Sequence, residues 1–246
     1  MQGLRRGYHS NCWGPVGGHP VGGTAIKDLT YMTFGDMRTA IEEIAAVGYT
    51  GVEMFDGNLE ALAQSPADLR ALLANTGVHL FAVYSGANFI YPDVLNDELS
   101  RIERITSIAA EFEAEYLGIG GGAKRPEGGQ DDDYERLAEG RGRGSDIADQ
   151  HGRVAHYHPH LTTLGETSAE VARIFSLTPI NFCPDMAHLA AAGGDPAQMI
   201  REHADRIKYV HLKDLRFEPF AFLPLGKGEL DMSAIIEALA EIKYDG

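Results

Sequence analysis

Three histidines in one short segment are the residues whose chemistry stands out first. His156, His158 and His160 alternate along Arg153–His160, which has the pattern of a short strand. Alternate residues of a strand share a face, so the three imidazoles point the same way. Imidazoles that converge on a pocket can bind a metal, transfer protons or bind an anion. A polar strand end with ordinary surface histidines would have the same pattern, so the segment alone leaves both interpretations open.

Composition and charge limit the class of partner. The 246 residues are 44% hydrophobic and 23% charged, which suits one large α/β domain or two small ones. A formal net charge of −15 disfavours nucleic acid or an anionic membrane as the main partner, because these partners need a basic surface. The sequence has only two cysteines, Cys12 and Cys183, no apolar leader and no run as long as a membrane span. We therefore expect a cytoplasmic protein without disulfides.

Strands and helices are expected to alternate along the chain. Glycine and proline between Asn11 and Thr24 predict a loop, which carries the only tryptophan, Trp13, and Thr33 with Asp36 resembles a helix-capping pair. We expect strands near 5–9 and at 49–55, 78–84, 115–119, 154–158, 180–184 and 207–212. We expect helices between Asp36 and Gly48 and at 66–77, 93–112, 134–150, 167–175, 196–204 and 233–242, with a charged loop at 124–133.

The spacing and parity of the strands predict the fold. The expected strand ends Glu53, Tyr84, Ile119, His158, Asp185 and His211 follow one another by 31, 35, 39, 27 and 26 residues, the pace of repeated βα units. Several strands are apolar at one parity and polar at the other. A doubly wound sheet would be apolar at both parities, whereas a barrel can turn the polar parity toward its mouth. We therefore predict a single α/β domain over residues 1–246, a (β/α)8 TIM barrel.

Three residues of the polar parity form a candidate metal site. His158, Asp185 and His211 lie at the ends of three successive predicted strands, so barrel closure would bring them together. Imidazole and carboxylate suit Zn, Mn, Co or Fe(II), and a mixed set with open positions favours a catalytic site over a structural one.

Other polar residues lie near these strand ends. Lys213 can polarise a carbonyl or stabilise an enolate, or instead form a salt bridge to a loop carboxylate. Glu53 can act as a general base or belong to an ion pair at the rim. His160 and His188 can orient a ligand or contact substrate, although surface imidazoles would fit as well.

A glycine cluster invites a different interpretation. Residues 118–123 match G-x-G-x-x-A after a strand, as in dinucleotide-binding proteins. That fingerprint needs a helix to begin at once, and Lys124-Arg-Pro-Glu-Gly-Gly follows instead. We interpret the glycines as leaving room for a substrate, and Cys12 and Cys183 as small apolar residues.

Several segments together resemble the xylose-isomerase-like sugar isomerase/epimerase superfamily of TIM barrels, and the resemblance runs through nearly the whole chain. They are Gly48–Glu53, Cys183–His188 with Gly193–Pro196, Val210–Asp214, and Gly226–Asp231 with Tyr244–Gly246. The segment His156–His160 is most similar to the branch that includes inosose dehydratase.

The resemblance implies roles for residues and a departure from the pattern. It implies that Asp185 and His211 bind metal, that His158 stands where the epimerases have a glutamate ligand, and that His188 and Lys213 contact substrate; we add Trp13 and His160 as substrate-binding candidates. A second glutamate ligand would lie on an eighth strand beyond Gly246. We therefore expect the chain to be truncated at its C-terminus, with weakened metal binding, while Glu229 is expected in a turn before the last helix.

The expected function is that of a divalent-metal-dependent isomerase or epimerase, with Mn, Co, Zn or Mg as the cofactor. It would act through an enediolate on a keto-sugar or keto-polyol, with Glu53, Lys213 and His188 as candidate catalytic residues. The alternatives are an inosose dehydratase, a metal-dependent endonuclease of abasic DNA, which the net charge of −15 disfavours, and a non-catalytic sugar-binding or scaffold barrel. A homo-oligomer is compatible with all of them.

Overall fold

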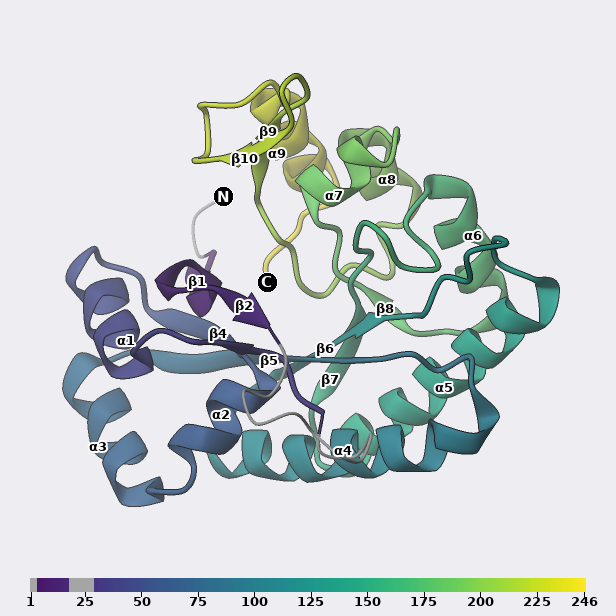
Figure 1. The fold of residues 1–246 in the computed structure, drawn as a ribbon. Helices are drawn as coiled ribbons and strands as arrows, with labels where there is room; N and C mark the ends of the chain where they lie inside the picture. Colours follow the sequence, from purple (N-terminus) through teal and green to yellow (C-terminus); the bar gives the residue numbers. More distant parts are fainter. Residues whose placement is uncertain (1–3, 18–28) are drawn as a thin grey trace.

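The main sheet is parallel throughout, as predicted. The computed structural model describes residues 4–17 and 29–246, and within them six strands are paired in the order β1-β4-β5-β6-β7-β8 (Figure 1). These strands are β1 (Gly7–His9), β4 (Gly51–Phe55), β5 (His79–Ala87), β6 (Tyr116–Gly121), β7 (Val154–Tyr157) and β8 (Asn181–Phe182). Two further pairs of strands are antiparallel: β2 (Val16–Gly17) with β3 (Met32–Thr33), and β9 (Asp214–Arg216) with β10 (Ala221–Leu223), which form a hairpin.

Helices cover the outside of this curved sheet, and α4 and α5 lie side by side beneath it (Figure 1). Along α4 the buried residues Leu95, Leu99, Ile102 and Ile105 recur every three or four positions, so one stripe of the helix enters the core. No helix in 4–17 or 29–246 is long and apolar enough to cross a membrane. The helices are η1 (Ser10–Trp13), α1 (Met37–Ala46), α2 (Asp56–Leu62), α3 (Pro66–Thr76), α4 (Pro92–Glu111), α5 (Asp131–Gln150), α6 (Ser168–Leu177), α7 (Met186–Ala191), α8 (Pro196–Glu202) and α9 (Met232–Glu241).

Close packing around its glycines explains why α5 contains them. Each glycine costs roughly 1 kcal/mol relative to alanine in a helix interior. A Cβ on Gly140 would overlap the ring of Phe89, and a Cβ on Gly144 would lie 2.8 Å from Ile119. Small residues therefore let α5 approach its neighbours closely. The helix begins at Asp131, earlier than expected, so the end of the expected charged loop at 124–133 is helical.

Side chains fill the space beside the glycines of β6. A Cβ on Gly120 would overlap the hydroxyl of Tyr84, and a Cβ on Gly118 would lie 3.2 Å from Cε1 of His156. His156 is fully buried and stacks on Tyr209, with ring centroids 5.0 Å apart and planes 8° apart. The expectation that these glycines leave room for substrate is wrong, because they make room for Tyr84 and His156.

The expected strand at 207–212 is reduced to two isolated bridges, which pair Phe182 with Ile207 and Asp185 with His211. Lys208 N–H donates to Phe182 O at 3.2 Å and His211 N–H donates to Pro184 O at 3.0 Å, so the segment runs parallel to β8. Among the described residues it has a strand neighbour on that side only, which leaves the ladder incomplete. The last element is α9, and closure by an eighth strand stays a prediction.

Several local features differ from expectation. Thr33 belongs to β3, and Asp36 alone caps α1 by accepting from Arg38 N–H at 3.0 Å. The expected loop at Asn11–Thr24 contains part of η1 and β2, while its residues 18–24 lie outside the described part of the chain. The short helices α2 and α7 and the two antiparallel strand pairs were not expected; α2 begins directly after β4 without a side-chain cap.

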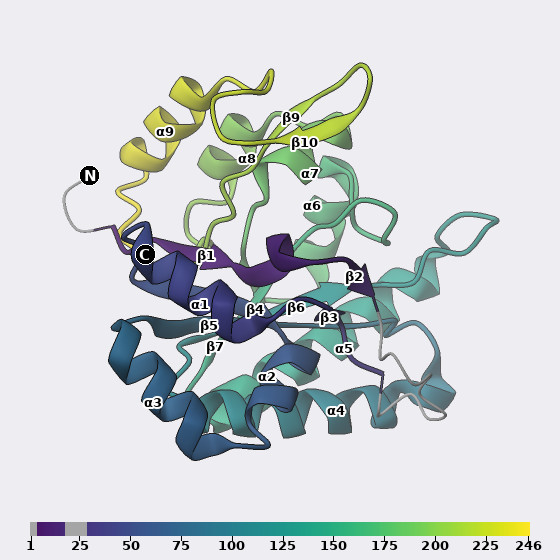
Figure 2. The ribbon, with the colours of Figure 1, turned by 60° about the vertical axis from the view of Figure 1, so that its left-hand side comes forward.

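The hairpin of β9 and β10 lies beside α7 (Figure 2). The buried carboxylate of Asp214 holds the segment that follows this hairpin. Asp214 accepts hydrogen bonds from the backbone N–H groups of Leu215, Gly226, Gly228 and Leu230 at 2.8 to 3.3 Å. Glu229 lies in the turn before α9, as expected, and accepts from Phe217 N–H at 3.0 Å. The base of the hairpin is therefore fixed, while Phe217, Phe220 and Phe222 are exposed.

Candidate metal centre

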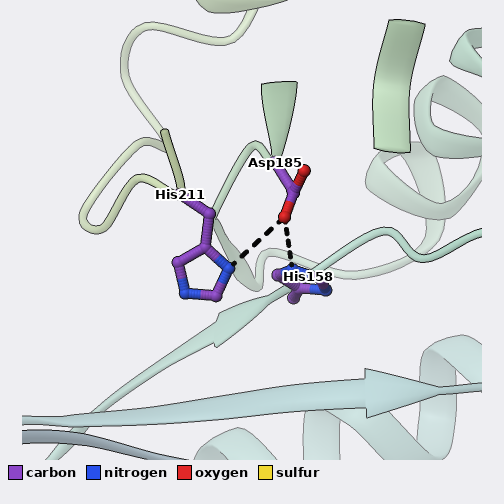
Figure 3. A group of neighbouring side chains, drawn as sticks. All are labelled: His158, Asp185 and His211. Atoms are coloured by element: carbon purple, nitrogen blue, oxygen red, sulfur yellow. Dashed lines mark ion pairs between the residues drawn. The ribbon is translucent and has the colours of Figure 1, made fainter. Parts of the chain in front are cut away.

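The three predicted ligands come together at the strand ends. His158 directly follows β7, Asp185 precedes α7, and His211 pairs with Asp185 across the bridge described above. One potential ligand atom of each residue lies within 4.8 Å of the other two. Figure 3 shows both imidazoles turned toward Asp185, with His158 Nε2 3.4 Å and His211 Nδ1 3.7 Å from Oδ2.

The two oxygens of Asp185 have separate tasks. Oδ1 accepts from the backbone N–H groups of Ala187 and His188, both at 3.0 Å, and so caps α7. Oδ2 faces the two imidazoles and lies 3.7 Å from Nζ of Lys213. Burial opposes ionisation, but the hydrogen bond from His158 and the charge of Lys213 hold the pKa of Asp185 well below its usual value. Asp185 is therefore a carboxylate, the form that binds cations.

His158 is in the form that binds metals. Burial lowers its pKa to about 4, so the imidazole is neutral near pH 7. Its Nδ1 is buried and has no hydrogen-bond partner among the described residues. Two imidazoles and one carboxylate, whose potential ligand atoms lie within 4.8 Å of one another, fit a divalent transition metal with open coordination positions.

Glu53 lies behind this cluster and contacts one of its members. Its side chain is 3% exposed, and Oε2 lies 2.7 Å from Nε2 of His211. Burial opposes ionisation, but the charge and hydrogen bond of His211 keep the pKa of Glu53 well below its usual value. His9 approaches from the other side, with Nε2 3.9 Å from Oε1.

Lys213 and His188 form the adjoining side of the site. Nζ of Lys213 lies 3.0 Å from Nε2 of His188, so the ammonium belongs to this cluster and its carboxylate contact is Asp185. Burial and the charge of Lys213 keep the pKa of His188 far below its usual value, even though Asp185 favours protonation. The ring of His160 lies 3.9 Å from that of His188, between centroids. His160 is half-buried, whereas His188 is only 2% exposed, so His160 is the more accessible of the two rings.

Trp13 is the one predicted site residue that the structure does not bring into this group. Its indole N–H donates to Glu43 at 2.6 Å and its ring packs against Tyr8. With these two residues it lines a surface cleft beside α1. Its assignment to substrate binding stays a prediction.

Two residues near the site were missed by the sequence reasoning. His9 pairs in register with Glu53, so β1 ends at the same level of the sheet as this residue. Sequence patterns could not reveal His9, because a strand of three residues is too short to show an alternation of polar and apolar positions. Phe222, on β10, places its ring 4.2 Å from Nζ of Lys213 and 5.2 Å from the ring of His188. Only a hairpin folding back over the barrel brings it there, and the sequence pattern gave no signal for that hairpin.

Comparisons with known proteins agree with this architecture. A family model described as a xylose isomerase-like TIM barrel matches residues 41–246. The chain is similar to an inosose dehydratase of Geobacillus kaustophilus, 29% identical over 84% of this chain and 76% of that protein. An inosose dehydratase of Lacticaseibacillus casei is 33% identical, over 47% of this chain and 46% of that protein, so this match spans less than half of the relative.

Solved structures show the same fold at low sequence identity. The crystal structure of the probable 3-DHS dehydratase AsbF from Bacillus anthracis aligns with a TM-score of 0.77 at 12% identity, over 97% of this chain and 89% of that one. The D-allulose 3-epimerase from Methylomonas sp. in complex with D-allulose aligns with a TM-score of 0.76 at 18% identity, over 100% of this chain and 83% of that one. The predicted TIM-barrel fold is confirmed.

Proposed function

The chain belongs to the xylose isomerase-like TIM barrel family, and we propose that it is a divalent-metal-dependent enzyme acting on a keto-sugar or keto-polyol through an enediolate. The observation that carries the proposal is the buried cluster of His158, Asp185 and His211. These residues would hold Mn, Co, Zn or Mg. When bound, the cation would polarise the substrate carbonyl and so acidify the adjacent C–H bond.

The protein's own groups would move the proton. Lys213 and His188 are hydrogen-bonded to each other and lie beside the cluster. Neutral His188 can take a proton from substrate carbon or pass one on, while a charged Lys213 stabilises the negative oxygen of the enediolate. His160 and the exposed ring of Phe222 border the same space, which would exclude water from part of it.

Dehydration is the second outcome that these groups could support. After the proton is removed, return of a proton to carbon gives isomerisation or epimerisation, whereas loss of a neighbouring hydroxyl gives dehydration. The similarity to an inosose dehydratase over 84% of the chain supports dehydration of a cyclic keto-polyol. In that case His188 or Lys213 would donate a proton to the departing hydroxyl.

Solvent hydrogen exchange tests this function directly. Metal-free protein would be supplied with Mn²⁺ or Co²⁺ and incubated in deuterated water with an inosose and, separately, with an open-chain ketose. We expect deuterium at the carbon next to the ketone, or a dehydrated product. Asp185→Asn should abolish the reaction. Asp195→Asn is the matched control, because Asp195 also caps a helix, α8, through the N–H of Gln198.

The proposal is contradicted if neither substrate class exchanges hydrogen at any metal concentration. Retention of full activity in Asp185→Asn would contradict the assignment of the site, even if the activity itself were found.

A further inference from the structure

His211 is held between two carboxylates that use different nitrogens of its ring. Nε2 lies 2.7 Å from Oε2 of Glu53, and Nδ1 lies 3.7 Å from Oδ2 of Asp185. Figure 3 shows the nitrogen that faces Asp185. An ionised carboxylate can only accept a hydrogen bond, so Nε2 must carry a hydrogen. Burial opposes a charged ring, but the two carboxylates raise the pKa of His211 and so favour a second hydrogen on Nδ1 when no cation is bound. Once the ring is neutral, Nδ1 is the nitrogen with a lone pair to offer toward the cluster.

Glu53 is poorly placed to act on a substrate. It lies in the middle of β4, its side chain is 3% exposed, and Oε2 is occupied by His211. Oε1 is buried and has no hydrogen-bond partner among the described residues. Nε2 of His9 lies 3.9 Å from this oxygen.

The tautomer of His9 is set by its own neighbour. The backbone N–H of Asn11 donates to Nδ1 of His9 at 3.1 Å, at the start of η1. Since Nδ1 accepts, the neutral ring carries its hydrogen on Nε2, which is the atom that faces Glu53. A chain of groups thus runs from the backbone of η1 through His9 and Glu53 to His211 and ends at the cluster.

We propose that Glu53 and His9 are positioning residues that fix His211 in the tautomer whose Nδ1 binds the metal. A ligating imidazole is commonly oriented by a carboxylate on its other nitrogen, and loss of that partner weakens metal binding. The inference rests on the metal site of the proposed function. It gives Glu53 a different task from the general base that the sequence suggests, and it leaves proton transfer at substrate carbon to Lys213 and His188.

Nuclear magnetic resonance of the ¹⁵N-labelled histidines tests the tautomers, first without metal and then with Zn²⁺. We expect Nε2 of His211 to carry a proton in both states and Nδ1 to respond to Zn²⁺. Glu53→Gln should lower Zn²⁺ affinity by about 10 to 100-fold, as measured by calorimetry. His9→Phe should lower it less, and His9→Gln, which keeps an N–H donor, should restore part of the loss.

Glu98→Gln is the matched control. Glu98 is also a fully buried glutamate that accepts several hydrogen bonds, but from Asn88 and Phe89. It should destabilise the fold without changing Zn²⁺ affinity of the folded protein. The inference is overturned if Nε2 of His211 loses its proton on Zn²⁺ binding, if the Glu53 carboxylate itself binds the metal, or if Glu53→Gln binds Zn²⁺ as the wild type does. If the wild type binds no metal, the proposed function fails, while the metal-free tautomers still report on Glu53 and His9.

Discussion

Lys213 and His188 share a contact that can exist in two proton arrangements. Nζ of Lys213 lies 3.0 Å from Nε2 of His188, and the backbone N–H of Leu161 points at Nδ1 of the same ring from 3.4 Å. A neutral imidazole has one N–H and one acceptor, so it cannot accept at both nitrogens. Either an ammonium donates to Nε2 and the bond from Leu161 is given up, or Nε2 donates to a neutral amine. The two arrangements differ by one proton, which the pair would have to release or take up.

Replacement of Lys213 tests whether this proton is used in the reaction. Lys213→Met keeps the length of the side chain and removes the amine, so deuterium exchange into substrate should fall by about 10²-fold or more, with metal binding unchanged. Lys213→Arg keeps the charge but cannot deprotonate, and should be nearly as inactive. Lys208→Met, at an exposed lysine near the bridge, is the control. Full activity in Lys213→Arg would show that only the charge matters.

Removal of metal should lower stability. A metal present at 100 times its dissociation constant stabilises a folded protein by about 2.7 kcal/mol. For a domain of this size we expect chelation to lower the melting temperature by about 5 to 10 °C. Asp185→Asn should melt at the same temperature with and without Mn²⁺, whereas Asp195→Asn should keep the shift. A chelator that leaves the wild-type melting curve unchanged would contradict the metal site.

Acid should destabilise the barrel through its buried imidazoles. Burial lowers the pKa of His156 to about 3, and that of His9 to about 4, below the unfolded value of about 6.5. Below pH 6.5 the unfolded chain binds protons that the folded chain does not. The free energy of unfolding is therefore unaffected by these histidines above this pH and decreases as the pH drops. Each such histidine should lower the free energy of unfolding by about 1.4 kcal/mol at pH 5.5.

His156→Phe should reduce this loss, because a phenyl ring keeps the stacking on Tyr209 and has no nitrogen to protonate. Urea unfolding at pH 8.0 and pH 5.5 measures the difference. His79→Phe, at an exposed position of β5, is the control and should keep the wild-type pH dependence. An equal pH dependence in His156→Phe and wild type would show that His156 does not contribute.

Phe222 should contribute to substrate binding. Its ring is 42% exposed while it contacts both Lys213 and His188. Phe222→Ala should raise KM for the substrate several-fold, because the apolar side of the site is lost, with a smaller effect on kcat. Phe217→Ala, at 47% exposure on the same hairpin, should leave both constants unchanged. Equal effects of the two substitutions on KM would show that Phe222 has no specific role in substrate binding.

Sequence patterns predicted the cluster because it depends on parity and on strand order. His158, Asp185 and His211 end successive β/α units, and parallel pairing places such ends at one edge of a barrel. The same argument could have included His9, which is level with Glu53, but β1 is too short to show alternation. The helix α7 was not expected because its six residues are too few to show a helical period, even though Asp185 caps it.

The remaining differences come from tertiary packing. The glycines of β6 look like an opening in the sequence, but Tyr84 and His156 come from neighbouring strands to fill that space. The segment 207–212 has the pattern of a strand, yet it forms only two bridges because pairing depends on partners that its own sequence does not specify. The hairpin of β9 and β10 is held by four backbone donors to Asp214, a long-range arrangement without a local sequence signal.

The way Asp214 holds the hairpin bears on how substrate preference could evolve. Within the described part of the chain, each hydrogen bond to its carboxylate comes from a backbone N–H, in Leu215 and in the segment 226–230. Side chains at the tip of the hairpin, between 217 and 222, are not needed for this anchoring. Mutations there can change the wall that faces Lys213 and His188 at little cost to folding, so the shape of this side of the site can vary while its anchor at Asp214 stays the same.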